Sequence, residues 1–277
     1  MAEVLRTRDL TKRYKGKTAL DGLSVSLEEG HIYGLVGANG AGKTTTVRLI
    51  DGLIKPTSGR VLIHSADTAT SPVSDRARRV GFLFQNPDRQ ICKNTVREEI
   101  LFGLKTVRGE EGEEALNARC EEVLKDFGFT GDEEPFSLSR GQRQRVALAS
   151  ILAVEPEILI LDEPTTGMDY RECCHIMDRI RRMNEEQQVT VIMVCHDMEV
   201  VLDYATRALV MSGGKLLADG PVKEIFRNTE LMEEASILPP QMIGLSMRLG
   251  EGFGDAVTPE EMADAVMARR KGGARHE

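Results

Sequence analysis

The sequence predicts an α/β fold organised around a phosphate-binding loop, with an inserted helical subdomain and a small helical extension at the C-terminal end. The first observation is the stretch GANGAGKTT at residues 37–45, which fits the pattern G-x-x-x-x-G-K-[ST]. The second is a run of helical patterns at about 88–150, flanked by short apolar runs typical of buried strands. The third is a change of character after about residue 228, where Pro239 and Pro240 break the chain. We therefore expect a main domain over 1–228 and an extension over 229–277, in contact with a dimer mate or another partner.

Composition narrows the class of protein. The chain has 277 residues, of which 41% are apolar and only 4% aromatic, so its core should be aliphatic. Its net charge of −8, from 36 basic and 44 acidic residues, argues against a dedicated nucleic-acid binder. The five cysteines are odd in number and follow no metal spacing, which indicates free thiols. Since no apolar run approaches the ~18 residues that span a bilayer, we expect any membrane role to come through a partner.

The phosphate-binding loop has the context that its chemistry needs. The apolar run 31–36 predicts a short buried strand before it, and 44–53 predicts a helix that ends at Gly52. Glycines allow successive N–H groups to point into one concavity, and the helix N-terminus adds partial positive charge there. Lys43 supplies a full charge for the outer phosphates, and the Thr44 hydroxyl can ligate magnesium. The nucleotide-binding residues expected in the loop are Gly37, Ala38, Asn39, Gly40, Ala41, Gly42, Lys43, Thr44 and Thr45.

Before the loop, alternation predicts strands at 5–10 and 23–27, with Gly16 and Gly22 in the turns around them. Tyr14 lies between these strands, in a polar region that is a poor place for a core aromatic. Its ring could stack on an adenine base, or it could be an ordinary surface tyrosine. The residues alone leave both interpretations open.

After the first helix, strands are predicted at 59–63 and 79–83, and Gln85 follows the second at the point where strand becomes loop. The sequence T-V-R-E, from Thr95 to Glu98, predicts a capping box that opens a helix through Phe102. Apolar residues at helical spacing predict a further helix over 110–127.

A second helix start and a strand end carry further polar residues. Ser139 is the expected N-cap of a helix that begins RGQRQRVALA, and such a start is a candidate anion-binding site. The aliphatic run 158–163 predicts a buried strand that ends in Asp162 and Glu163. Because successive strand residues face opposite sides, the two carboxylates must do different work: one can hold magnesium, the other can face the attacking water as a general base.

The remaining α/β part is predicted as a helix over 170–188, a buried strand over 189–195, a hairpin of 207–212 with 215–218, and a helix over 221–227. His196 follows the buried strand directly, so a functional and a structural role are both open. The other histidines lack that context. In the extension, PPQMIGLSMRLG is a methionine-rich amphipathic stretch, and T-P-E-E at Thr258 predicts a last helix to about Met267. This segment could contact a partner or simply cover the end of the core.

Taken in order, these stretches resemble the ATP-binding subunit of ABC transporters, a P-loop NTPase fold, over nearly the whole chain. The resemblance is carried by Tyr14, GANGAGKT, Gln85, LSRGQ, ILILDE, Asp169 and His196. The NPDRQ segment after Gln85, the VREEILFGL helix and the tail around Pro239, Pro240 and Gln241 are similar to the ATPase of energy-coupling factor importers, which carry vitamins or transition metals such as cobalt and nickel.

The resemblance implies ATP and Mg²⁺ as ligands and a role for each matching position. Tyr14 is implied to stack on adenine, and residues 37–45 to cradle the phosphates. The remaining roles in the chain's own site are Thr44, Gln85 and Asp162 for magnesium, Glu163 for the attacking water, and His196 for the γ-phosphate.

Other positions are implied to act between subunits. Ser139, Gly141 and Gln142 are implied to contact the nucleotide held by an opposing ATPase subunit, identical or not, and Asp169 to lie between the two sites. Arg140 stands where the family usually has a glycine, and it could strengthen phosphate binding or mark a site tuned differently from its partner's. The further partners implied are a transmembrane scaffold, facing the loop after Gln85, and a substrate-binding membrane component, which place the protein at the cytoplasmic face of the cell membrane.

Two alternatives stay open at this point. One is an ATPase subunit of another ABC importer or of an exporter. The other is a soluble ABC ATPase with no transport role, such as an assembly factor or a translation-associated protein. The acidic charge and the single cassette weaken the translation-associated version.

Overall fold

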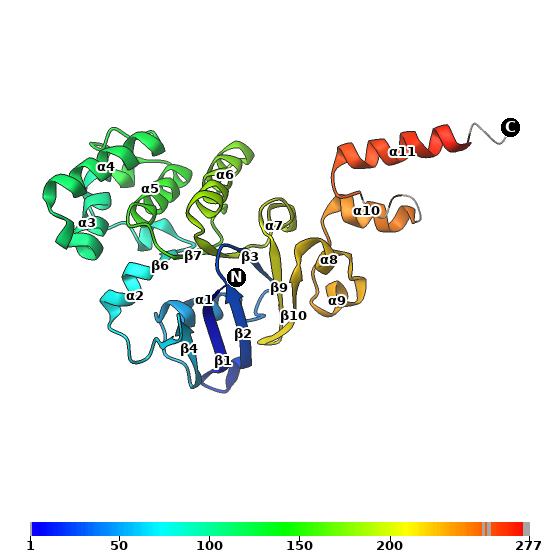
Figure 1. Ribbon diagram of the computed structural model, residues 1–277, viewed down its shortest axis with the longest axis horizontal. Helices are drawn as coiled ribbons and strands as arrows, with labels where there is room; N and C mark the ends of the chain where they lie inside the picture. Colours follow the sequence, from blue (N-terminus) through cyan, green and yellow to red (C-terminus); the bar gives the residue numbers. More distant parts are fainter. Residues whose placement is uncertain (1, 251–252, 254–255, 274–277) are drawn as a thin grey trace.

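A six-stranded sheet, in the order β10-β9-β3-β8-β7-β6, forms the centre of the computed structural model, which describes residues 2–250, 253 and 256–273 (Figure 1). Five strands run parallel, and β10 pairs antiparallel with β9 at one edge. A parallel sheet is covered on both faces, which is why its strands are continuous aliphatic runs. The strands are β3 (Ile32–Val36), β6 (Val80–Leu83), β7 (Ile158–Asp162), β8 (Thr190–Val194), β9 (Arg207–Ser212) and β10 (Lys215–Pro221). The predicted strands are confirmed here, and so is the hairpin of β9 with β10.

A smaller antiparallel sheet, in the order β2-β1-β4-β5, packs near one face of the large sheet. Its strands are β1 (Glu3–Tyr14), β2 (Lys17–Glu28), β4 (Ser58–Ile63) and β5 (Ala66–Asp67). Both β1 and β2 are longer than predicted, because register shifts interrupt the alternation along the pair. The prediction that Gly22 lies in a turn is wrong. Gly22 lies inside β2 with φ of 68°, and its N–H donates to Thr11 Oγ1 over 3.1 Å at one of these irregularities.

The large sheet separates two apolar cores. One core lies between the two sheets and includes helix α1 (Lys43–Asp51), while the other lies under the helices on the opposite face. Strand β7 shows the division residue by residue: Ile158 and Ile160 belong to the first core, and Leu159 and Leu161 to the second. The same alternation brings Asp162 to the α1 side of the sheet.

Residues 88–150 are helical, as the sequence predicts, and they gather at one side of the molecule (Figure 1). The Thr95 capping box is confirmed, but its helix runs six residues past Phe102 to Arg108. The segment holds α3 (Val96–Arg108), α4 (Glu113–Phe127) and α5 (Arg140–Leu152), with short 3₁₀ turns at Pro87–Arg89, Gly109–Glu111 and Pro135–Ser137. After β7 comes α6 (Tyr170–Gln187), whose buried side chains belong to the same core as those of α3 to α5.

Three short helices are absent from the sequence prediction: α2 (Val73–Arg79), α7 (Met198–Tyr204) and α9 (Thr229–Glu234). Each has six or seven residues, which show little helical period, although the helix at Val222–Arg227 is as short and was predicted. Two of them nevertheless begin at local N-caps: the Asp197 side chain accepts from the N–H of Glu199 in α7, and the Asn228 side chain accepts from the N–H of Leu231 in α9.

The C-terminal part consists of α8 (Val222–Arg227), α9, α10 (Gln241–Leu249) and α11 (Pro259–Gly273). Met232, Ala235 and Ile243 are buried in the core under the helices, whereas Phe253 and Met262 belong to a small separate cluster. The capping box at Thr258 is confirmed, because Glu261 N–H donates to Thr258 Oγ1 and Thr258 N–H donates to Glu261 Oε2. Helix α11 projects away from the body of the molecule (Figure 1).

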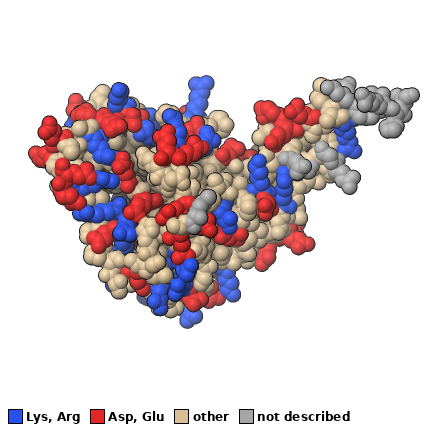
Figure 2. Space-filling view, in the orientation of Figure 1, with Lys and Arg blue, Asp and Glu red and all other residues tan. Residues whose placement is uncertain are grey.

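On the face drawn in Figure 2, the described Lys and Arg side chains are interspersed with Asp and Glu. Within the described residues, every helix is too short or too polar to cross a lipid bilayer.

Candidate functional site: a phosphate loop and a carboxylate pair

The loop between β3 and α1 is closed by glycines that no other residue could replace without strain. Gly37 has φ of 149°, and a Cβ added there would lie 2.2 Å from the carbonyl oxygen of Met211. Gly42 has φ of 106°, and its Cβ would lie 2.8 Å from the carbonyl oxygen of Ala19. These positions fall in backbone conformations that L side chains rarely adopt, and close neighbours occupy the space. The loop therefore owes its shape to contacts with β9 and with β2.

Lys43, the first residue of α1, folds back over this loop. Its ammonium group donates to the carbonyl oxygens of Gly37 and Ala38, over 2.7 Å and 3.1 Å. Only 5% of the residue is exposed, and burial lowers the pKa of the ammonium group, while the carboxylates of Glu163 and Asp162 act in the opposite sense. A buried cation held against a loop of N–H groups is suited to an anion with several negative charges.

Asp162 ends β7 on the same side of the sheet. Its Oδ1 accepts a hydrogen bond from the Thr44 hydroxyl over 3.3 Å, and the residue is 2% exposed. Burial raises the pKa of this carboxyl group, and the charge of Arg48 partly offsets that effect. A hydroxyl and a buried carboxylate beside a phosphate loop are oxygen ligands of the kind that Mg²⁺ prefers, with substrate phosphates completing the shell. The residues therefore fit magnesium, although no three His, Cys, Asp or Glu side chains of the described residues form a metal site by themselves.

Glu163 leaves the strand with an unusual backbone. Its φ is 55°, in the left-handed region, and its N–H donates to the carbonyl oxygen of Val194 over 3.0 Å. Because β7 ends at Asp162, the left-handed backbone of Glu163, and not strand alternation, turns its side chain to a different neighbourhood from that of Asp162.

Three side chains hold the Glu163 carboxylate. Its Oε2 accepts hydrogen bonds from Gln85 Nε2 over 2.7 Å and from the Thr166 hydroxyl over 3.1 Å. Its Oε1 lies 3.1 Å from His196 Nε2. The structure thus brings together Gln85, Glu163 and His196, which lie far apart in sequence. In this arrangement the Gln85 amide faces Glu163 through its nitrogen.

A second group of predicted residues lies at the start of α5 and α6. Ser139 caps α5: its hydroxyl accepts from Gln142 N–H over 3.2 Å, and Gln142 Oε1 accepts from Ser139 N–H over 2.9 Å. The N-cap role of Ser139 is confirmed. Asp169 caps α6 in the same manner, because its carboxylate accepts from Glu172 N–H over 2.9 Å. Ser139, Arg140 and Asp169 are exposed, while Gly141 is buried.

Tyr14 ends β1 with 48% of its surface exposed, and the Lys12 ammonium group lies 5.1 Å from the centre of its ring. An exposed aromatic face remains available to a planar ligand, and the sequence interpretation of Tyr14 stays a prediction.

Thr166 and Arg48 are residues of this site that the sequence reasoning missed. Thr166 binds the Glu163 carboxylate directly, and Arg48 acts on Asp162 through its charge. Thr166 lies three residues after Glu163, and a hydroxyl so close to a strand-end carboxylate was an available signal. Arg48 gave none, because an arginine in a helix is most often a solvated side chain.

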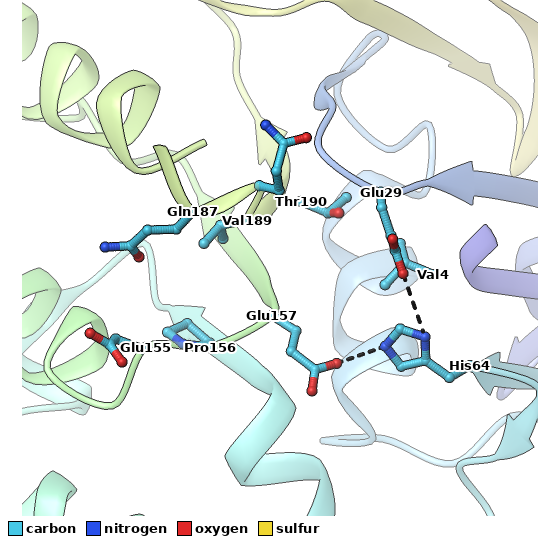
Figure 3. A pocket seen from close by; sticks show the side chains of 10 residues that line it. Val4, Glu29, His64, Glu155, Pro156, Glu157, Gln187, Val189 and Thr190 are labelled. Carbon is cyan, nitrogen blue, oxygen red and sulfur yellow. Dashed lines mark hydrogen bonds and ion pairs between the residues drawn. The ribbon is translucent and has the colours of Figure 1, made fainter. Parts of the chain in front are cut away.

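A hollow of about 600 Å³ lies at the opposite edge of the large sheet, where β7 and β8 begin (Figure 3). Its lining includes Glu29 ahead of β3 and Glu157 ahead of β7. His64 lies between them, with Nε2 2.7 Å from Glu157 and Nδ1 3.8 Å from Glu29. This histidine has no part in the chemistry proposed below, because strand starts and strand ends lie at opposite edges of a parallel sheet.

A buried strand, a glycine loop closed over a lysine and a neighbouring carboxylate pair define a P-loop nucleotide-binding protein. A family profile for ABC transporters matches residues 20–166. The chain belongs to the ABC transporter family, and it has the fold of that family's ATPases.

Individual relatives and solved structures support this family assignment. The chain is 42% identical, over 95% of its length, to a protein of Caldanaerobacter subterraneus described as an ABC transporter ATP-binding protein. It spans only 46% of that relative, and it spans less than half of the next ones too. It is 39% identical to the energy-coupling factor transporter ATP-binding protein EcfA2 of Acetivibrio thermocellus, over 85% of this chain and 84% of the relative.

Among solved structures, cbiO1 from Clostridium perfringens, part of the ABC transporter complex cbiONQ, matches with a TM-score of 0.74 and 31% identity over 90% of this chain and all of that one. A dimeric ATP-binding cassette in a post-hydrolysis state, bound to ADP and Pi, matches with a TM-score of 0.72 and 30% identity, covering 79% of this chain and 98% of that one.

Proposed function

We propose that this protein binds and hydrolyses ATP to power an energy-coupling factor type importer of vitamins or transition-metal ions. The observation that carries the proposal is the Glu163 carboxylate, held by Gln85, Thr166 and His196 beside a phosphate loop. Similarity to an energy-coupling factor ATPase over most of both chains supports the transporter type. The similarity to a subunit of the cbiONQ complex points the same way.

In the proposed mechanism, Lys43 and the N–H groups of residues 37–45 bind the phosphates, and Tyr14 stacks on the adenine. When ATP arrives, the Lys43 ammonium group exchanges its two carbonyl contacts for phosphate oxygens. Thr44, Asp162 and Gln85 would hold Mg²⁺, which would supply charge neutralisation at the phosphates. Glu163 accepts a proton from the attacking water as general base, and His196 contacts the γ-phosphate.

Two subunits share each ATP in this proposal. Ser139, Gly141 and Gln142 of one subunit face the nucleotide of the other, and Asp169 lies between the two sites. The N-terminus of α5 supplies N–H groups to the γ-phosphate, so ATP bridges the pair and loss of phosphate removes the bridge. A ligand drives such a cycle only if its affinity differs between open and closed pairs. A transmembrane scaffold would convert closing and opening into transport, with a separate membrane component that binds the substrate, and the ATPase would work at the cytoplasmic face.

The test is to purify the tagged protein from gently solubilised membranes of its own host and to identify every chain that comes with it. We expect a polytopic scaffold and a small substrate-binding membrane protein. A second ATPase in equal amount would make the pair a heterodimer. Recovery of soluble partners alone would reject the transport role and favour a soluble ABC ATPase.

A further inference from the structure

Two close contacts join the first turn of α5 to the loop that leads into α6. The side chain of Arg140 lies along Gly167, where an added Cβ would be 3.0 Å from Arg140 Cδ and 3.1 Å from its Nε. In return, Glu172 of α6 approaches Gly141, where an added Cβ would be 2.7 Å from Glu172 Oε2. Each contact depends on a glycine that leaves room for the side chain facing it.

The loop side of these contacts is fixed by its own geometry. Gly167 has φ of 82°, a conformation that favours glycine. Glu172 closes the capping box of α6, since its Oε2 accepts from Asp169 N–H over 3.4 Å. The Glu172 carboxylate that reaches Gly141 therefore also holds Asp169. The start of α5, the loop 167–169 and the start of α6 are consequently one packed unit.

Arg140 is not explained by the stability of α5 itself. A cation in the first turn of a helix opposes the macrodipole, and the first turn of α5 has no acidic residue to compensate it. What the arginine does provide is a long side chain whose Cδ and adjoining guanidinium atoms lie against the backbone of Gly167. Arg140, Gly167 and Asp169 are all exposed, so this packing lies at the surface.

We propose that Arg140 is a positioning residue, which fastens the Asp169 loop to the Ser139 end of α5 so that both meet a second subunit as one preformed surface. The proposal rests on the proposed function, in which that surface faces the other subunit. Preforming a binding surface reduces the ordering that association requires, so it strengthens pairing. ATP binding by the chain's own phosphate loop should be unaffected.

The first test uses the full-length protein without ATP, and it is independent of pairing. Hydrogen exchange is compared between the parent, Arg140→Ala and a matched control, Arg182→Ala, which removes an exposed arginine from the middle of α6. We expect faster exchange at residues 165–172 in Arg140→Ala alone, with β8 unchanged in all three. Unchanged exchange at 165–172 would overturn the proposal.

The second test measures ATP-driven dimerisation by sedimentation, in a Glu163→Gln background that slows hydrolysis. We expect Arg140→Ala to weaken the dimer roughly three- to tenfold, the range for ordering one or two side chains, with the ATP affinity of the monomer unchanged. Arg140→Met keeps an unbranched stem without the charge, and it should retain much of the effect. Restoration by Arg140→Lys but not by Arg140→Met would assign the role to charge and overturn the proposal.

The two tests separate this inference from the function on which it rests. If Glu163→Gln with Arg140 intact does not dimerise with ATP, this chain does not pair with itself; the purification from membranes then decides the proposed function, and hydrogen exchange alone decides whether Arg140 holds the loop. If the parent dimerises and Arg140→Ala dimerises equally well, the positioning role is rejected and the proposed function stands.

Discussion

The carboxylate of Glu163 accepts two hydrogen bonds and lies against a histidine, which fixes its direction at the end of β7. Strand alternation predicted that Asp162 and Glu163 serve different purposes, but the residues alone could not assign the roles. The left-handed backbone of Glu163 was also beyond prediction, because a glutamate gives no sign of it in sequence.

Glu163→Gln tests the general-base assignment. The amide keeps the shape of the carboxylate but cannot take a proton from water, so ATP turnover should fall by roughly 10²–10⁴. Steady-state phosphate release measures this, with a nucleotide-binding assay to show that ATP affinity survives. Near-normal turnover in the variant would remove Glu163 from the mechanism.

A second residue-scale prediction concerns Asp51, near the end of α1. Burial raises the pKa of this carboxyl group to about 6, although the charge of Arg76 opposes the effect. In the unfolded chain the pKa is about 3.9, so folding favours the protonated form. The contribution of the protonated Asp51 carboxyl group to folding stability is fully present below the unfolded pKa, and it is lost as pH rises through about 6.

Asp51→Asn should therefore stabilise the protein at pH 7.5 by about 1–3 kcal/mol, and by less at pH 4.5. Urea unfolding at the two pH values measures the difference, with Asp75→Asn as the control for an exposed carboxylate nearby. An equal effect of Asp51→Asn at both pH values would contradict the assignment.

At the scale of elements, the sequence predicted those helix starts whose cause lies in a few neighbouring residues. Thr95 with Glu98 predicted the start of α3, and Ser139 predicted the start of α5, because a cap acts within four residues. The short helix α7 was missed although Asp197 caps it locally, since its seven residues show little helical period. Gly22 was misplaced for a different reason: a glycine within a strand and a glycine in a turn look alike in sequence, and only the pairing of β1 with β2 distinguishes them.

Thr95→Ala tests the contribution of a cap to the whole fold. The Thr95 hydroxyl accepts from Glu98 N–H over 3.2 Å, and alanine leaves that group without its partner. We expect a loss of about 1 kcal/mol in the free energy of unfolding, measured by urea denaturation. Thr95→Ser keeps the hydroxyl and serves as the matched control; if it loses as much stability as the alanine variant, the cap is not the cause.

At the scale of the whole molecule, the α/β body was predictable because its strands are continuous aliphatic runs around a recognisable loop. How far the body extends was harder to predict, because helices far along the chain return to its core. Met232, Ala235 and Ile243 are each at most 3% exposed and share the core under α3 to α6. Burial of this kind depends on packing, which composition after residue 228 does not reveal.

Two truncations test where the stable unit ends. A chain that stops at Asn228 loses the buried side chains of Met232, Ala235 and Ile243, so we expect its stability to fall by several kcal/mol. A chain that stops at Gly250 keeps them and should unfold close to the full-length protein. Thermal unfolding of both, without nucleotide, provides the measurement. Equal stability of the two truncations would show that 229–250 adds little to the core.

The left-handed backbone of Glu163 has an evolutionary consequence. A residue other than glycine, asparagine or aspartate in this region costs about 1–3 kcal/mol, which the rest of the fold must offset. A lineage that no longer needed hydrolysis would be free to relieve this strain by replacing the glutamate with glycine or asparagine, becoming more stable as it lost activity. Inactive descendants of such a protein should therefore replace Glu163 early. They should be recognisable by a raised melting temperature together with intact nucleotide binding.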